Sequence, residues 1–202
     1  MKKIVLLLVF VLGFQKAQSQ VLMSLIFGDK LNSPNIEFGL EGGANFSTIS
    51  NQVGADTRTN FNLGFYFDFN LKNPSWAFNT GVIVKSSLGA EGLPVYSLND
   101  PNLDATFAEG SVSRKISYFN VPLGIKYKFD NRFYVKSGVQ LGLLSKAVDI
   151  FHQNYNGEDV EYKNNIRDKI HVVDAGLTFG LGYKFKVGHG LNLGLQYYYG
   201  LV

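Results

Sequence analysis

A repeated alternation of apolar residues with small or polar ones is the strongest constraint on the fold. In residues 133–144 most odd positions carry Phe, Val or Leu, while Lys136, Gly138, Gln140 and Gly142 occupy even ones. Because successive side chains point to opposite faces of a strand, a period of two predicts a strand with one apolar and one polar face. The same pattern returns in residues 36–46, 61–70, 76–89, 119–129, 173–186 and 191–200.

The polar face of these strands indicates what surrounds them. A soluble β-sandwich turns its apolar face inward and its charged face to water. Here the second face is rich in glycine and holds few charges per strand, and aromatic residues gather near the predicted strand ends. Aromatic girdles at two heights are typical of strands that face lipid. We therefore predict an all-β fold, an antiparallel up-and-down transmembrane β-barrel.

The connections between the predicted strands alternate in length. Short turns fall at residues 72–75, 130–132 and 188–190, and longer polar links at 48–60, 90–113 and 146–169. Outer-membrane barrels have short periplasmic turns, long external loops and an even number of strands. We expect eight strands, of which seven are visible in the sequence, so the C-terminal strand is predicted to be missing. Residues 21–35 are the weaker candidate for it.

The N-terminus has the features of a secretory signal. A basic start, an apolar stretch over residues 4–14 and Ala17-Gln18-Ser19 predict a signal peptide over residues 1–19. An N-terminal periplasmic segment would follow at 20–35, then the barrel domain at 36–202. The predicted location is the outer membrane of a Gram-negative bacterium. Loss of the signal removes three lysines and no acid from a net charge of +3. Nucleic acid is therefore not an expected partner.

Charged side chains on the polar face would point into the barrel. In a narrow barrel such charges must pair, and eight strands leave no aqueous channel. We therefore interpret them as a structural network and not as an ion path. The predicted members of this lumen network are Glu37, Glu41, Asp68, Lys85, Lys126, Lys128, Lys136, Gln140, Asp174 and Lys184.

No pattern in the chain predicts catalysis or a cofactor. There is no cysteine, and the histidines lack metal-ligand spacing. Residues 99–104 supply oxygen donors but lack the glycine and distal glutamate of a calcium loop. A lipid-modifying enzyme of the outer membrane would need a His and a Ser near the outer rim, and His171 with Ser117 or Ser145 is the only set that comes near this requirement. We therefore expect no enzyme. Residues 151–158 mix aromatic and amide side chains, which makes Phe151, His152 and Tyr155 candidates for recognition in a long loop.

Several strands resemble the PorT-like outer-membrane β-barrel proteins of Bacteroidetes. Residues 118–129 match the Tyr-x-x-hydrophobic-Pro-Leu-x-x-Lys-Tyr strand of that family, residues 39–46 its first strand, and residues 174–185 its Asp-x-Gly-hydrophobic strand. The resemblance extends over most of residues 36–200. It implies an integral outer-membrane barrel without catalytic residues, and the namesake is required for export by the type IX secretion system.

We accordingly expect a monomeric, non-enzymatic scaffold or accessory in protein secretion or envelope assembly. Its expected partners are outer-membrane lipid and secretion or envelope proteins. The alternative is a surface ligand-binding or adhesion barrel that uses its long loops, and the third hypothesis is the lipid-modifying enzyme.

Overall fold

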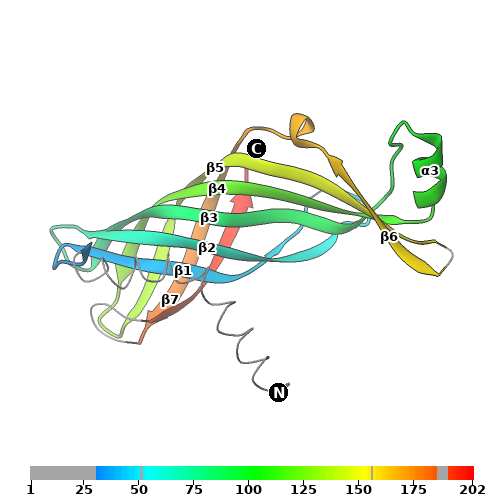
Figure 1. Ribbon diagram of the computed structural model, residues 1–202. Helices are drawn as coiled ribbons and strands as arrows, with labels where there is room; N and C mark the ends of the chain where they lie inside the picture. The colour runs from blue at the N-terminus through cyan, green and yellow to red at the C-terminus, as the bar shows by residue number, and fades with distance from the viewer. Residues whose placement is uncertain (1–30, 51, 156, 186–190) are drawn as a thin grey trace, which may run out of the picture.

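The protein folds into a curled antiparallel sheet (Figure 1). The computed structural model describes residues 31–50, 52–155, 157–185 and 191–202. The strands pair in the order β1-β2-β3-β4-β5-β7-β8, and β6 pairs with β5 off this path. Their bounds are β1 Ile36–Ser47, β2 Asp56–Asn70, β3 Trp76–Leu93, β4 Ser111–Lys128, β5 Phe133–Tyr155, β6 Glu158–Asn165, β7 Val173–Lys184 and β8 Asn192–Gly200. The predicted all-β, up-and-down antiparallel architecture is confirmed.

The seven strands that the alternation predicts are the seven strands on the path of the sheet. The structure adds a strand off this path, β6, which lies inside the predicted link 146–169 and forms a hairpin with β5. The predicted signal peptide and residues 20–30 lie outside the described residues. Among the described helices, none is long and apolar enough to span a membrane.

Two of the predicted loops are largely ordered secondary structure. β3 and β4 extend into the link 90–113, and the helix α3 (Pro101–Phe107) lies between them. Asp100 caps this helix, because its Oδ1 accepts hydrogen bonds from the backbone N–H groups of Asn102 and Leu103 at 2.9 and 3.3 Å. Residues 99–104, considered above for calcium, are therefore a helix N-terminus with its cap. The short 3₁₀ helix η1 (Arg167–Lys169) follows β6.

Two β-bulges divide the molecule into a barrel and a head. In β5, Lys146 pairs with Ser117 and Leu144 with Tyr118, so Ser145 is an extra residue. In β3, Val84 is the extra residue between the positions that pair with β2. One extra residue moves every following side chain to the other face of the sheet. We call residues 86–117, 146–155 and 157–170 the head, and the rest of the sheet the barrel.

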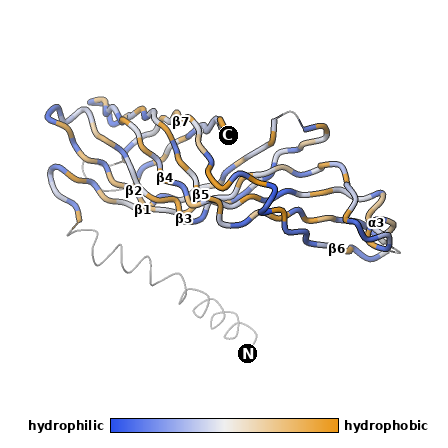
Figure 2. The backbone as a smooth tube through the Cα atoms, turned by 90° about the horizontal axis from the view of Figure 1, so that it is seen from above, coloured by the Kyte–Doolittle hydropathy of each residue, from blue (hydrophilic) through white to orange (hydrophobic). Residues whose placement is uncertain are grey.

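The outer face of the barrel is apolar. Figure 2 shows hydrophobic and hydrophilic residues alternating along its strands. The large apolar side chains that this face exposes include Leu40, Phe46, Phe61, Phe69, Trp76, Phe119, Val121, Ile125, Phe133, Val135, Val139, Leu141, Leu143, Leu177, Phe179, Leu181, Leu193, Leu195, Tyr197 and Tyr199. An apolar outer face flanked by aromatic residues at both ends is what lipid contact requires.

The head packs in the opposite sense. Its hydrophobic cluster lies between the extended strands and α3, at the end of the molecule farthest from the short turns (Figure 1). The buried members of this cluster are Ala90, Leu93, Phe107, Val112 and Phe151. A second cluster lies where the head joins the barrel, with Tyr118, Leu144, Ala147 and Ile166 as its buried members. The head thus has an apolar interior of its own.

Candidate functional site

The barrel interior near the short turns holds a buried ion pair. Asp68 of β2 is 0% exposed and accepts hydrogen bonds from Lys126 Nζ and, at 2.6 Å, from Asn79 Nδ2. The Lys126 ammonium also lies 5.1 Å from the ring centroid of Tyr66 and 4.8 Å from that of Tyr134. Two aromatic faces and a carboxylate therefore surround this lysine, which compensates for its removal from water.

A second ion pair joins the two ends of the sheet. Lys184 of β7 binds the Glu37 carboxylate of β1, and Tyr66 donates to Glu37 Oε1 at 3.1 Å. Asn192 of β8 in turn donates to Tyr66 Oη at 3.0 Å. Among the described residues β1 pairs only with β2, and β8 only with β7. These side-chain bonds therefore hold the two sheet edges together near the short turns.

Glycine on the lumen face makes room for these rings. A Cβ atom added to Gly39 would overlap the ring of Tyr66, and one added to Gly182 would overlap that of Tyr134. The small residues and the large ones thus interlock across the interior, as a narrow barrel requires. The lumen near the short turns is filled by protein side chains.

The other predicted network members occupy different settings. Lys128 donates to Asn70 Oδ1, and Asp174 accepts from Tyr198 Oη. Gln140 is buried, while Glu41 and Lys136 are half-buried in the lumen. Neither of these two charged residues forms an ion pair with another described residue.

The prediction for Lys85 is wrong. Its parity within β3 predicts a lumen position, but the bulge at Val84 turns it to the outer face opposite Leu63. There its ammonium lies 5.8 Å from the ring centroid of Phe61. A single extra residue leaves no trace in an apolar-polar pattern, so the alternation could not reveal it.

The loop assignment of the three recognition candidates is also wrong. Phe151 lies within β5, is 1% exposed and packs against the rings of Tyr96 at 5.0 Å and Phe107 at 5.8 Å between centroids. His152 lies on the opposite face of β5, with Nδ1 3.3 Å from Glu161 Oε1. Tyr155 ends the strand. The His152 side chain is partly exposed at the surface of the head.

The head contains a polar centre that the alternation did not predict. The buried Asp149 accepts two hydrogen bonds from Arg114, from Nε to Oδ1 and from Nη2 to Oδ2, both at 2.8 Å. Tyr96 also donates to Asp149 Oδ2 at 2.8 Å, and Asn164 donates to Tyr96 Oη at 2.9 Å. The bonds to Asp149 raise the pKa of Arg114, while burial is the largest cause of the raised pKa of Tyr96. One carboxylate thus ties together β4, β5, β6 and the link before α3.

A carboxylate among apolar residues was the available signal for this centre. Asp149 occupies the same parity as Leu141, Leu143 and Phe151, and between Leu141 and Phe151 the other polar member of this series is Ser145. A buried charge of this kind requires a partner, and Arg114 lies directly opposite in the register. The pairing could be predicted only once the register between β4 and β5 was known.

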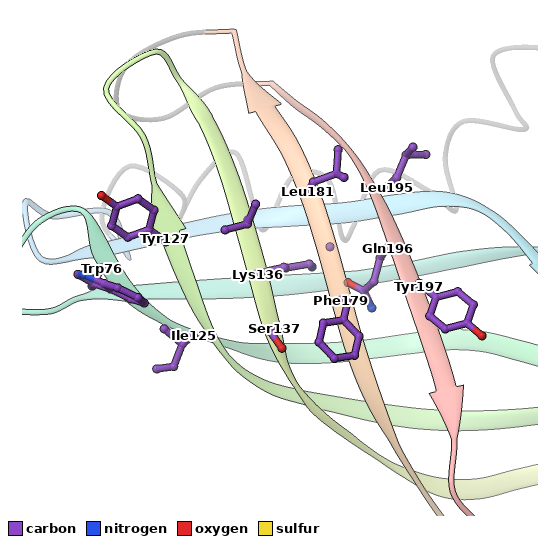
Figure 3. A pocket seen from close by; sticks show the side chains of 12 residues that line it. Trp76, Ile125, Tyr127, Lys136, Ser137, Phe179, Leu181, Leu195, Gln196 and Tyr197 are labelled. Atoms are coloured by element: carbon purple, nitrogen blue, oxygen red, sulfur yellow. The ribbon is translucent and has the colours of Figure 1, made fainter.

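A hollow lies on the outer face of the barrel (Figure 3). It has a volume of about 650 Å³ and is lined mainly by apolar side chains of β3, β4, β5, β7 and β8. Ser137 is small and stands between Ile125 and Phe179 in one row across the strands. Trp76, Tyr127 and Tyr197 line the same hollow. Most of these side chains belong to the apolar outer face of the barrel.

The residues considered for an enzyme do not form a described cluster. Ser117 Oγ lies 3.0 Å from Ser87 Oγ, within a hydrogen bond between two strands. Ser145 is the exposed bulge residue and His171 is exposed beyond η1. Among the described residues, no group of three or more His, Cys, Asp and Glu side chains could hold a metal ion.

An antiparallel curl with a lipid-facing apolar surface and ion pairs inside defines an integral membrane β-barrel. The chain belongs to the family described as outer membrane protein beta-barrel domain, which matches residues 17–202. Its location is accordingly the outer membrane. No curated protein and no solved structure matches the chain.

Proposed function

We propose that this protein is a non-enzymatic, monomeric outer-membrane scaffold whose head meets partner proteins in secretion or envelope assembly. The barrel anchors the head in outer-membrane lipid. The single observation that carries the proposal is the head itself, a folded extension with its own hydrophobic cluster and the Asp149–Arg114 centre. Rigid scaffolds that display surfaces in this way commonly carry binding functions.

The lumen supports a structural role for the barrel. Its central charges are paired, in Asp68 with Lys126 and in Glu37 with Lys184. Aromatic rings fill the space beside these pairs. A pathway for ions would need hydrated, accessible charges, and this interior offers a packed network near the short turns instead.

The ordered head also supports protein partners. A surface that is already rigid loses less conformational entropy when it binds, which favours specific docking. The resemblance of residues 118–129 to the PorT-like strand suggests the type of partner. On that basis we propose an accessory role in protein export of the type IX kind, with the head outside the cell and the short turns in the periplasm.

The test is complementation of a deletion strain. The strain receives the wild-type gene or a head variant in which His152, Asn154 and Glu161 are all replaced by Ala, and the secreted and outer-membrane proteins are compared. We expect the deletion and the head variant to show the same loss of exported proteins. The matched control replaces Lys72, Asp130 and Asn131 of the short turns by Ala. Unchanged exported proteins in the deletion strain would overturn the proposal.

The second candidate function is ligand binding or adhesion at the tip of the head. It is favoured by a polar groove of about 390 Å³ that is lined by Glu109, His152, Asn154, Asp159 and Glu161 among others. The same strains separate the two functions. Loss of surface adhesion with a normal set of exported proteins would favour this second candidate.

A further inference from the structure

Three lysines lie on the outer face where the apolar band of the barrel ends. We call Lys85, Lys115 and Lys146 the rim lysines. Lys146 is the next outward-facing residue of β5 beyond Leu143 and the bulge, and it pairs with Ser117. Lys115 is the next outward-facing residue of β4 after Ser117. Lys85 follows the bulge of β3 and pairs with Leu63 of the apolar face.

The two bulges are what place two of these lysines outside. If the same residues of β3 alternated without a bulge, Lys85 would share the inner face of Ile83, and in β5 Lys146 would likewise share the inner face of Leu144. Bulges in two separate strands thus bring a lysine to the same face at the same boundary. Lys115 reaches that face through the unbroken alternation of β4.

The rim lysines carry charge that no described carboxylate neutralises. The ion pairs of the described residues involve other cations. Two acids of the head have other partners, since Glu91 pairs with Arg58 at 3.2 Å and Glu161 lies beside His152. Lys85 also packs against the exposed ring of Phe61, the arrangement of an aromatic and a lysine at a membrane interface.

We propose that the rim lysines bind the phosphate groups of anionic lipid headgroups in the outer leaflet. Their position selects a lipid over a free anion, because the same face directly below them is apolar and contacts acyl chains. A lysine ammonium is a compact charge with three donors, which suits a phosphate group. The inference rests on the proposed orientation, with the head outside the cell.

The test measures lipid retention by the purified full-length protein in a zwitterionic detergent. Native mass spectrometry counts bound lipid A, a glycolipid that carries two phosphates, and its dephosphorylated form as a matched probe. We expect the wild type to retain the phosphorylated form preferentially. Lys85→Gln, Lys115→Gln and Lys146→Gln together should weaken this preference by roughly fivefold per lysine, and so by up to about a hundredfold.

The control variant removes the same charge elsewhere, with Lys72→Gln, Lys163→Gln and Arg167→Gln. It should keep the preference of the wild type, and heat-modifiable gel migration should show that both variants fold. Equal retention of both lipids, an equal loss in the control, or displacement of the lipid by millimolar inorganic phosphate would each overturn the inference. Labelling of an Asn154→Cys variant on intact cells with a membrane-impermeant thiol reagent tests the orientation separately, and labelling only after the cells are lysed would overturn the outer-leaflet assignment.

Discussion

The barrel and the head are built from the same three central strands, yet they bury opposite kinds of residue. In the barrel, Asp68 and Lys126 are inside and Leu141 and Leu143 are exposed. In the head, Val112 and Phe151 are inside and lysines lie outside. The difference follows the surroundings, because apolar surface is stable against lipid but not against water. A strand that leaves the membrane must therefore exchange the roles of its two faces.

The three strands make this exchange by two different routes. β3 and β5 each insert one residue, so an apolar series that continues on one parity passes from the outer to the inner face. β4 keeps its parity and changes its sequence instead, from Phe119 and Val121 to Lys115 and Ser117 on the outer face. Its inner residues change in parallel, from Asn120 to Ile116 and Val112. A bulge thus exchanges the inner and outer faces of a strand while its apolar residues keep their spacing of two along the chain.

Insertion of one alanine between Ala147 and Val148 should have the largest effect on this comparison. The bulge at Ser145 already accommodates one extra residue, so a second would turn Asp149 and Phe151 to the outer face. We expect loss of the head's core while the barrel still forms. Limited proteolysis should cut residues 94–110 and 157–170 rapidly, with heat-modifiable migration preserved. The controls are Ser145→Ala, which keeps the residue count, and deletion of Ser145, which leaves Lys146 and every later residue of β5 on its present face. An equally protected head in the insertion variant would contradict the bulge argument.

The second-largest effect is expected for Lys126→Met, which should destabilise the barrel. The variant leaves the fully buried Asp68 without its charged partner, which should cost about 3–5 kcal/mol of unfolding free energy. Equilibrium unfolding in detergent measures the change. Lys136→Met, at a lumen lysine without an ion pair among the described residues, should cost less. Adding Asp68→Leu to Lys126→Met should recover much of the loss, and a double variant no more stable than Lys126→Met would speak against an unpaired charge as the cause.

Phe151→Ala should affect the head and leave the barrel unchanged. It removes a buried ring from contact with Tyr96 and Phe107, at a cost of about 3 kcal/mol. The cost falls on local opening, so hydrogen exchange of head amides should accelerate while barrel amides stay protected. Ile150→Ala, on the opposite and half-buried face of the same strand, is the control. Equal acceleration in both variants would show that the head has no preferred inner face.

The sequence predicted the barrel strands because lipid imposes a strict period of two on them. It did not predict where Lys85 points, or that Phe151 is buried, since a bulge changes facing without changing the pattern. α3 has only seven residues, too few to establish a helical period, although Asp100-Pro101 is a recognisable helix start. Strand β6 is polar and short, so the link around it resembled a loop. The apolar-polar alternation therefore predicted the strands where they contact lipid, and it failed where they pass from lipid into water.

The smallest effect is expected at Asp104, which ties the start of α3 to the preceding link. Its carboxylate accepts hydrogen bonds from Ser97 Oγ at 2.6 Å and from the Leu98 backbone N–H at 2.7 Å. These bonds lower the pKa of Asp104 below its ordinary value of about 3.9. A lowered pKa means that the folded head binds this proton less readily than the unfolded chain. The stabilisation is therefore present above the ordinary pKa and is lost as the pH falls through the lowered one.

Pepsin, which is active in acid, can measure this loss directly at residues 94–110. At the upper end of its working range the wild type should be cut more slowly than Asp104→Asn, and the two rates should converge as the pH falls below the lowered pKa. Asp168→Asn in η1 serves as the charge-matched control and should follow the wild type. Because the barrel's buried ion pairs are distant from this site, its heat-modifiable migration should be the same for all three proteins. A rate difference that persists at the acid end would show that something other than the Asp104 charge holds the link to α3.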